Sequence, residues 1–181
     1  MSVLERISKC GVTPPRITIY GRPGVGKSTL ASTFPKPLFL TTEDPKVMGI
    51  DVLEIKNYQD AIETIKSLLK SENLEYKTIV VDSLSKLDAM VVNHVITSDK
   101  AKTLASACGG YGAGYAKAQE LHRVLKHYLD MFQRKGMAVV YVAYRAIKTI
   151  KPPDADDYDY YSIEINHDKS AQVYIDDVDA V

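Results

Sequence analysis

Residues 21–28 have the sequence GRPGVGKS, which matches the phosphate-binding pattern Gly-x-x-x-x-Gly-Lys-Ser/Thr at every fixed position. A β-rich run, RITIY at 16–20, precedes it, and a helix is expected over 27–34, before two prolines. In such a loop the glycines allow successive backbone N–H groups to point at phosphate oxygens. We therefore predict a phosphate-binding loop (P-loop) for a nucleoside triphosphate. Its predicted nucleotide-binding residues are Gly21, Arg22, Pro23, Gly24, Val25, Gly26, Lys27, Ser28 and Thr29.

Three side chains are expected to hold the triphosphate and its metal. Lys27 would reach the β- and γ-phosphates, and the Ser28 hydroxyl would ligate Mg²⁺. Asp82 ends the apolar run KTIVVD, and a carboxylate at the carboxyl end of a parallel strand would lie beside the same metal ion. A turn aspartate is the alternative for Asp82. The expected ligands are ATP and Mg²⁺.

Two further positions are candidates for the chemistry at the γ-phosphate. Glu43 follows the expected strand 37–41, and it would act as general base if that strand neighbours the P-loop strand. Asp44 is the alternative base, and a solvated loop acid is the other interpretation. Tyr144 closes the apolar run MAVVYVAY, where it either senses the γ-phosphate or only ends a strand; Arg145 follows it.

Strands and helices are expected to alternate along the chain, which predicts an α/β fold with a mostly parallel sheet between helices. Asn57 is a suitable N-cap for the helix expected to follow it. The further strands are expected at 51–55, 77–82, 137–144 and 174–181, and the further helices at 58–71, 83–96 and 115–135. Residues 97–115 are expected to form a loop.

The composition indicates one soluble domain over 1–181, with an N-terminal extension at 1–14. Lysine plus arginine total 23 and aspartate plus glutamate total 23. This balance disfavours a protein that coats nucleic acid by bulk charge, although a local basic groove stays possible. Two distant cysteines indicate free thiols in a reducing compartment. The sequence offers no signal peptide and no run of about 18 apolar residues, so we expect a cytoplasmic protein without a membrane partner.

Four blocks of sequence together carry a family resemblance: GRPGVGKSTLASTFPKPLFLTTED, TIVVDSLSKL, GGYGAGY and GMAVVYVAYRAIK. In this order they resemble the phage-encoded P-loop ATP-binding proteins with a RecA-like core, a group that includes recombinases and single-strand annealing proteins. The resemblance implies a three-layer RecA-like ATPase domain acting in phage DNA recombination or annealing in the host cytoplasm. It implies that Glu43 activates water and that Asp82 lies by Mg²⁺. RecA proteins often carry an amide where Tyr144 stands, so the sensor role departs from the family pattern.

The resemblance also implies nucleic-acid contacts through two loops, expected to be mobile, at 100–117 and 145–161. In the first, Tyr111 and Tyr115 would stack on unpaired bases and Lys117 would pair with phosphate; the alternative is that the tyrosines anchor the loop to the core. Alternatively, Arg145, Lys148 or Lys151 would reach a neighbour's γ-phosphate as a trans finger, which requires a homo-oligomer, a ring or a filament. The expected partners are single-stranded DNA and a phage single-strand binding protein.

Two other classes of function remain open at this stage. One is a nucleotide-gated interaction module or loader that binds ATP with little hydrolysis. The other is a small-molecule or nucleotide kinase, which needs arginines clustered in a lid. The chain has six arginines and no such cluster.

Overall fold

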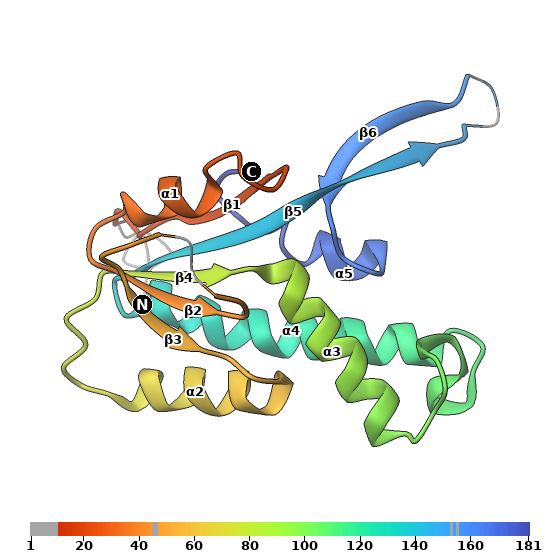
Figure 1. Ribbon diagram of the computed structural model, residues 1–181, viewed down its shortest axis with the longest axis horizontal. Coiled ribbons are helices and arrows are strands. Elements are labelled where there is room, and N and C mark those ends of the chain that lie inside the picture. The colour runs from red at the N-terminus through yellow and green to blue at the C-terminus, as the bar shows by residue number, and fades with distance from the viewer. Residues whose placement is uncertain (1–10, 45–46, 153, 155) are drawn as a thin grey trace, which may run out of the picture.

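A computed structural model of the protein describes residues 11–44, 47–152, 154 and 156–181. One mixed sheet forms its centre, and helices lie on both faces of it (Figure 1). The strands are β1 (Arg16–Gly21), β2 (Pro37–Thr41), β3 (Asp51–Glu54), β4 (Thr78–Asp82), β5 (Ala138–Ile150) and β6 (Tyr158–Ile163). The helices are α1 (Lys27–Ser32), α2 (Tyr58–Lys70), α3 (Leu84–Ser98), α4 (Ala113–Arg134) and α5 (Asp168–Gln172), with a 3₁₀ helix at Leu104–Gly109.

The strand order is β1-β5-β4-β2-β3, and all of these neighbours are parallel. Only β6 is antiparallel, and it pairs with the distal half of β5. The P-loop strand β1 therefore neighbours β5, and β2 neighbours β4 and β3. The condition set for Glu43 to act as base, that β2 lies beside the P-loop strand, is not met. The predicted three-layer α/β fold with a mostly parallel sheet is confirmed.

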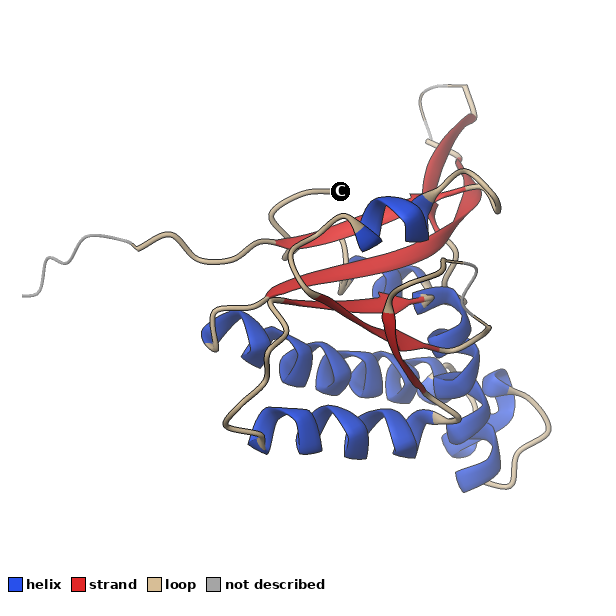
Figure 2. Cartoon of the chain, turned by 60° about the vertical axis from the view of Figure 1, so that its left-hand side comes forward, coloured by secondary structure: helices blue, strands red, loops and turns tan. Residues whose placement is uncertain are grey.

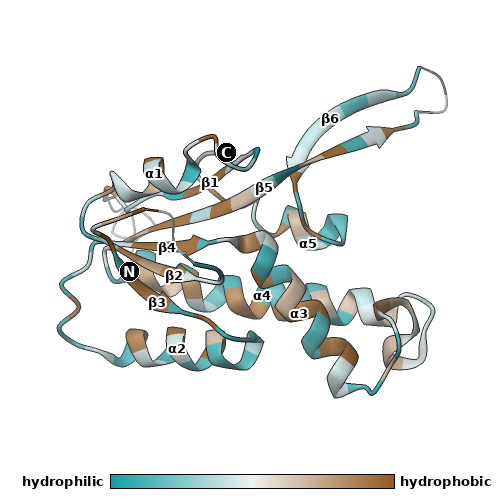
Figure 3. Ribbon diagram, viewed as in Figure 1, coloured by the Kyte–Doolittle hydropathy of each residue, from teal (hydrophilic) through white to brown (hydrophobic). Residues whose placement is uncertain are grey.

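The two faces of the sheet are covered unequally, as Figure 2 shows. Helix α1 covers one face with a small cluster that includes Ala31, Phe39 and Val140. Helices α2, α3 and α4 cover the other face with the larger core. Apolar residues accordingly concentrate in the central strands and on the inner stripes of the helices (Figure 3).

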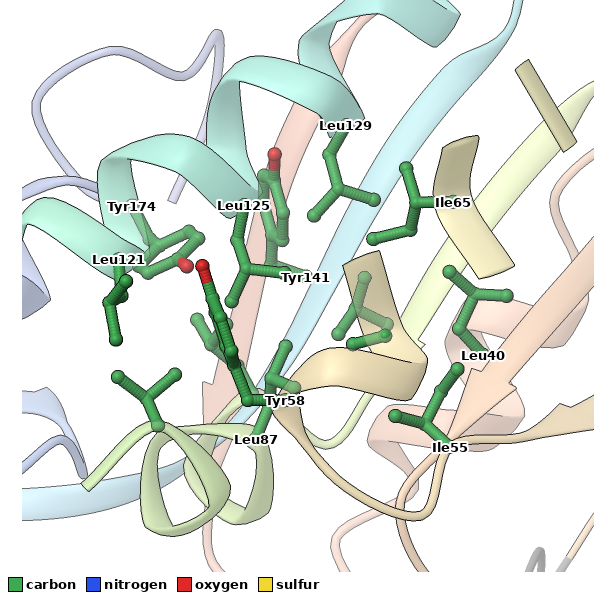
Figure 4. Packing of buried hydrophobic residues seen from close by; sticks show 14 of the residues in the cluster. Leu40, Ile55, Tyr58, Ile65, Leu87, Leu121, Leu125, Leu129, Tyr141 and Tyr174 are labelled. Carbon is green, nitrogen blue, oxygen red and sulfur yellow. The ribbon is translucent and has the colours of Figure 1, made fainter. Parts of the chain in front are cut away.

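Helix α4 supplies much of the larger core. Leu125, Leu129 and Phe132 recur at three- or four-residue spacing and are fully buried. Figure 4 shows Leu125 and Leu129 beside Tyr141 of β5 and Ile65 of α2. Burying one such leucine contributes about 1.5–3 kcal/mol, so this stripe fixes α4 beneath the sheet. On the same helix Val124 is exposed and Tyr128 is only partly buried.

The predicted helix ends depend on local hydrogen bonds and backbone freedom. Asn57 is the N-cap of α2, and its Oδ1 accepts a hydrogen bond from the backbone N–H of Asp60 at 3.0 Å. Gly136, just after α4, has φ of +82°, a conformation that glycine adopts without strain. Both ends were predicted from the sequence.

Three predicted elements differ in the structure. Residues 145–150 and 158–163 are not a loop: β5 continues past Tyr144 because its backbone pairs with β6 in a hairpin. Residues 97–115 contain the end of α3, the 3₁₀ helix and the start of α4. Residues 174–181 are not a strand; only the isolated bridge between Ile17 and Ala180 pairs there.

The ends of the described chain are attached to the sheet and α4. The backbone N–H of Arg16 donates to Asp179 at 2.7 Å, and the buried Lys126 Nζ donates to Asp177 at 2.9 Å. The Gln133 side chain donates to the Pro14 carbonyl at 2.7 Å. Most of the predicted extension, residues 1–10, lies outside the described residues. Within the part of the chain described, no helix has both the length and the apolar character to cross a membrane.

Candidate functional site

A cavity of about 240 Å³ lies at the carboxyl edge of the parallel strands. Strands β1, β2 and β4 end there, and β5 continues past it into its pairing with β6. The sheet register explains the convergence: Gly21 pairs with Tyr144, and Asp82 pairs with both Thr41 and Val142. The structure thus brings together the predicted phosphate, metal and base residues. The cavity is lined by Pro23, Gly24, Gly26, Lys27, Ser28, Thr29, Thr41, Glu43, Asp44, Val47, Asp82 and Tyr144.

The loop itself requires its glycines. Gly24 and Gly26 have φ of +77° and +93°, a region that side chains other than glycine rarely adopt. Gly26 is the N-cap of α1, so the chain turns from the loop directly into the helix. The backbone conformation thus explains why glycine stands at Gly26, the second fixed glycine of the motif, and at Gly24, one of its variable positions.

The Lys27 residue is 8% exposed and lines the cavity. Its Nζ donates to the carbonyls of Gly21 at 3.0 Å and Arg22 at 2.9 Å, and it lies 4.9 Å from the centroid of the Tyr144 ring. Burial lowers the pKa of Lys27, while the nearby carboxylates of Asp82 and Glu43 act to raise it. A phosphate oxygen would offer this ammonium group a stronger acceptor than either carbonyl.

Asp82 is half-buried, and the side chain of Ser28 lies beside it. Burial and the Glu43 carboxylate raise the pKa of Asp82, while Ser28 and Lys27 act to lower it. A hydroxyl and a carboxylate side by side fit Mg²⁺, which takes oxygen ligands and keeps most of its shell as water and substrate phosphate. Among the described residues no group of three or more His, Cys, Asp or Glu forms an all-protein metal site. The donor set fits a metal that is completed by a phosphate.

Glu43 reaches the cavity from the loop after β2. Tyr144 Oη donates to its Oε1 at 2.6 Å, and the Ser83 hydroxyl donates to the same oxygen at 3.4 Å. The Glu43 hydrogen bond is the largest of the causes that raise the pKa of Tyr144 to about 12. Glu43 is therefore close to the site although two strands, β5 and β4, lie between β2 and β1. Asp44 lines the cavity as well, so the choice of base between them stays open.

Two positions that sequence reasoning did not select support this arrangement. Thr42 Oγ1 accepts from the Ser83 backbone N–H at 3.0 Å and donates to the Ser83 carbonyl at 3.2 Å. These bonds join the ends of β2 and β4, and the Asp82–Ser83 peptide bond is cis. The only sequence signal was their place, directly after two strands that end on the same edge.

The candidate for sensing the γ-phosphate lies at the cavity, and the candidates for reaching a neighbour's γ-phosphate do not. Tyr144 lines the cavity, whereas Arg145, one residue further, stacks over the ring of Tyr161 at 4.2 Å. Lys148 forms an ion pair with Asp168 of α5. Neither Arg145 nor Lys148 lines the cavity.

The three nucleic-acid candidates differ in their exposure and in their contacts. Tyr111 is fully exposed. Tyr115 packs against the His167 ring with centroids 5.4 Å apart, and it contacts the larger core. Lys117 pairs with Glu120 at 2.9 Å and lines a different cavity from Tyr115. The packing of Tyr115 favours the anchoring interpretation for that residue.

Comparison with known proteins gives a family and a fold neighbour. A protein-family profile described as "AAA domain" matches residues 13–181. Among solved structures, a KaiC-like protein from the hyperthermophilic archaeon Pyrococcus horikoshii is similar, with 12% identity, a TM-score of 0.44, and coverage of 84% of this chain and 79% of that one. No curated protein matches the chain.

Proposed function

The chain belongs to the AAA domain family of P-loop NTPases, and from that premise we propose that it hydrolyses Mg·ATP in this cavity. The observation that carries the proposal is the meeting of Lys27, Ser28, Asp82 and Glu43 around one cavity at the end of the P-loop strand. These four residues supply an ammonium group, a hydroxyl and two carboxylates. Phosphoryl transfer to water needs these groups for charge neutralisation, metal binding and water activation.

Each residue has a separate task in the proposed reaction. The γ-phosphate displaces the two carbonyl oxygens from Lys27 Nζ, which then neutralises charge on the phosphate oxygens. Ser28 and Asp82 would hold Mg²⁺, which neutralises phosphate charge when bound. Glu43 orients a water molecule in line with the γ-phosphorus and takes its proton. The new P–O bond forms as the bond to the β-phosphate oxygen breaks, giving ADP and inorganic phosphate.

We further propose that the ATPase acts on single-stranded DNA in phage recombination or annealing, as a homo-oligomer with a phage single-strand binding protein as partner. The RecA-like sequence resemblance supports this role. The exposed Tyr111 ring, flanked by Gly110 and Gly112 and near the exposed Lys100 and Lys102 in sequence, offers a stacking face. Tyr115 and Lys117 would contribute only after leaving their present partners.

The kinase alternative receives no support from the cavity. Among the residues that line it no arginine is found, although a kinase lid needs arginines over both phosphate groups. The nucleotide-gated module remains as an outcome of the test below.

The test is ATP hydrolysis by the purified protein, with and without a dT oligonucleotide, at fixed salt. We expect hydrolysis that the oligonucleotide stimulates, and loss of stimulation but not of basal hydrolysis in Tyr111→Ala. Hydrolysis that does not respond to the oligonucleotide would contradict the DNA role alone. Tight ATP binding without hydrolysis would contradict the enzyme and favour a nucleotide-gated module.

A further inference from the structure

Tyr144 contacts both of the residues that the proposed mechanism places at the γ-phosphate. Its hydroxyl donates to Glu43 Oε1 at 2.6 Å, and its ring lies 4.9 Å from Lys27 Nζ. Lys27 belongs to the P-loop that leaves β1, and Glu43 follows β2. In the sheet order β1 and β2 lie on either side of β5 and β4. Tyr144 is thus the side chain that spans the site between them.

The backbone of Tyr144 is fixed from three directions. Its N–H donates to the Ser85 hydroxyl at 3.0 Å, and its carbonyl accepts from the Glu164 N–H at 2.8 Å. In the sheet it pairs with Gly21, the first residue of the P-loop. A hydroxyl held by such a backbone has a defined position relative to the phosphates, unlike the exposed loop that carries Glu43.

The two oxygens of Glu43 differ in their surroundings. Oε1 accepts from Tyr144 and from Ser83, while Oε2 has no hydrogen-bond partner in the described part of the chain. A carboxylate that acts as general base needs one oxygen available to the attacking water, and its orientation must be held for that water to be in line. The hydrogen bonds from the Tyr144 and Ser83 hydroxyls to Oε1 orient the carboxylate, and Oε2 stays available to take the proton of the attacking water.

We propose that Tyr144 is a positioning residue for ATP hydrolysis, which holds Glu43 by Oε1 so that Oε2 faces the attacking water. This inference rests on the proposed function, since it assumes that Glu43 is the base. It replaces sensing of the γ-phosphate with control of the base at this position. The raised pKa of Tyr144, about 12, means that the hydroxyl stays protonated and keeps donating at every pH at which the enzyme would be assayed.

The Tyr144→Phe variant removes the hydroxyl and keeps the ring that faces Lys27. We expect kcat to fall about 10- to 100-fold, since misplacing a reacting group by about 1 Å has an effect of that order. KM and the Kd for ATP should stay unchanged, because the ring and the P-loop are intact. Tyr20→Phe is the matched control: Tyr20 Oη contacts the Tyr161 carbonyl at 3.5 Å, away from the cavity, and its loss should leave kcat unchanged.

A double-mutant cycle with Glu43→Gln separates positioning from a general structural role. If Tyr144 acts through Glu43, adding Tyr144→Phe to Glu43→Gln produces no further loss in kcat. Equal losses in both backgrounds, or a rise in the KM for ATP as large as the fall in kcat, would overturn the inference. If Glu43→Gln itself leaves hydrolysis intact, the proposed function fails in its choice of base. If Glu43→Gln stops hydrolysis but Tyr144→Phe does not slow it, only the inference fails.

Discussion

Strand β5 passes through two environments that differ in almost every physical respect. Residues 139–142 have parallel neighbours on both sides, and residues 138–143 are buried, with the continuous apolar sequence AVVYVA. Beyond Tyr144 the strand continues as RAIKTI, pairs with β6 and rises away from the sheet in a hairpin (Figure 1). Ile147 and Tyr161 there are 57% and 58% exposed.

The two parts of β5 also differ in the polar contacts that they make. At the cavity edge, residues from the P-loop, β2, β4 and β5 converge, and their polar groups bond one another across elements. In the hairpin the polar contacts are mostly local, as between Thr149 and Asp159. Substitutions at the cavity should therefore change chemistry, while those in the hairpin should change neither chemistry nor stability by much.

The largest expected effect comes from Lys27→Ala. Removing a buried cation that faces the phosphates should lower kcat/KM for ATP by about 100- to 1,000-fold, the loss typical of a group that stabilises transition-state charge. Lys66→Ala is the matched control. Lys66 Nζ also lies over a tyrosine ring, 4.8 Å from the centroid of Tyr128, but Lys66 belongs to α2 and does not line the cavity. Steady-state hydrolysis of both variants measures the difference, and equal losses would contradict a specific role for Lys27.

Leu125→Ala tests the support beneath the cavity. Leu125 is fully buried between α4 and the sheet, so its truncation should lower the free energy of unfolding by about 2–5 kcal/mol. Ile147→Ala in the hairpin should change it by no more than about 0.5 kcal/mol. Urea unfolding of both variants gives the comparison. A large loss from Ile147→Ala would show that the hairpin is packed more tightly than its exposure indicates.

Asp82→Asn should stabilise the nucleotide-free protein at neutral pH. Burial raises the folded-state pKa of Asp82 above 3.8. Ionisation of Asp82 therefore begins to oppose folding above pH 3.8 and does so fully once the pH exceeds the raised folded-state pKa. The gain from Asp82→Asn should therefore be present at pH 7 and disappear as the pH falls below the ordinary carboxyl value of 3.8. Thermal unfolding at several pH values measures it, with Asp154→Asn in the exposed hairpin turn as a neutral control. Destabilisation by Asp82→Asn at pH 7 would contradict this account.

Much of the cavity could be predicted because its residues belong to patterns with one physical meaning. A glycine-rich loop between a strand and a helix, and an acid after a buried strand, place Lys27, Ser28 and Asp82 at one sheet edge whatever the strand order. The strand order itself could not be predicted. The role of Glu43 was therefore tied to a position of β2 beside the P-loop strand, which β2 does not occupy. Its approach depends on Tyr144 and Ser83, which are distant in sequence.

The hairpin was missed because its pattern differs from that of the core. Continuous apolar runs predicted the buried strands, and the run in β5 ends at Tyr144. The run RAIKTI mixes polar and apolar residues without strict alternation, and the prolines and aspartates at 152–159 favoured a loop. The C-terminal residues were predicted as a strand from short-range propensity, whereas ionic contacts of Asp177 and Asp179 with Lys126 and Arg16 determine their course.

The most direct test of the central claim compares Glu43→Gln with Asp44→Asn in single-turnover ATP hydrolysis, with ATP affinity measured in parallel. Both acids line the cavity, but only Glu43 is held by Tyr144 and Ser83. We expect Glu43→Gln to bind ATP with unchanged affinity and to lose hydrolysis, while Asp44→Asn retains both. Loss of hydrolysis in Asp44→Asn with a fully active Glu43→Gln would contradict the account and move the base to Asp44.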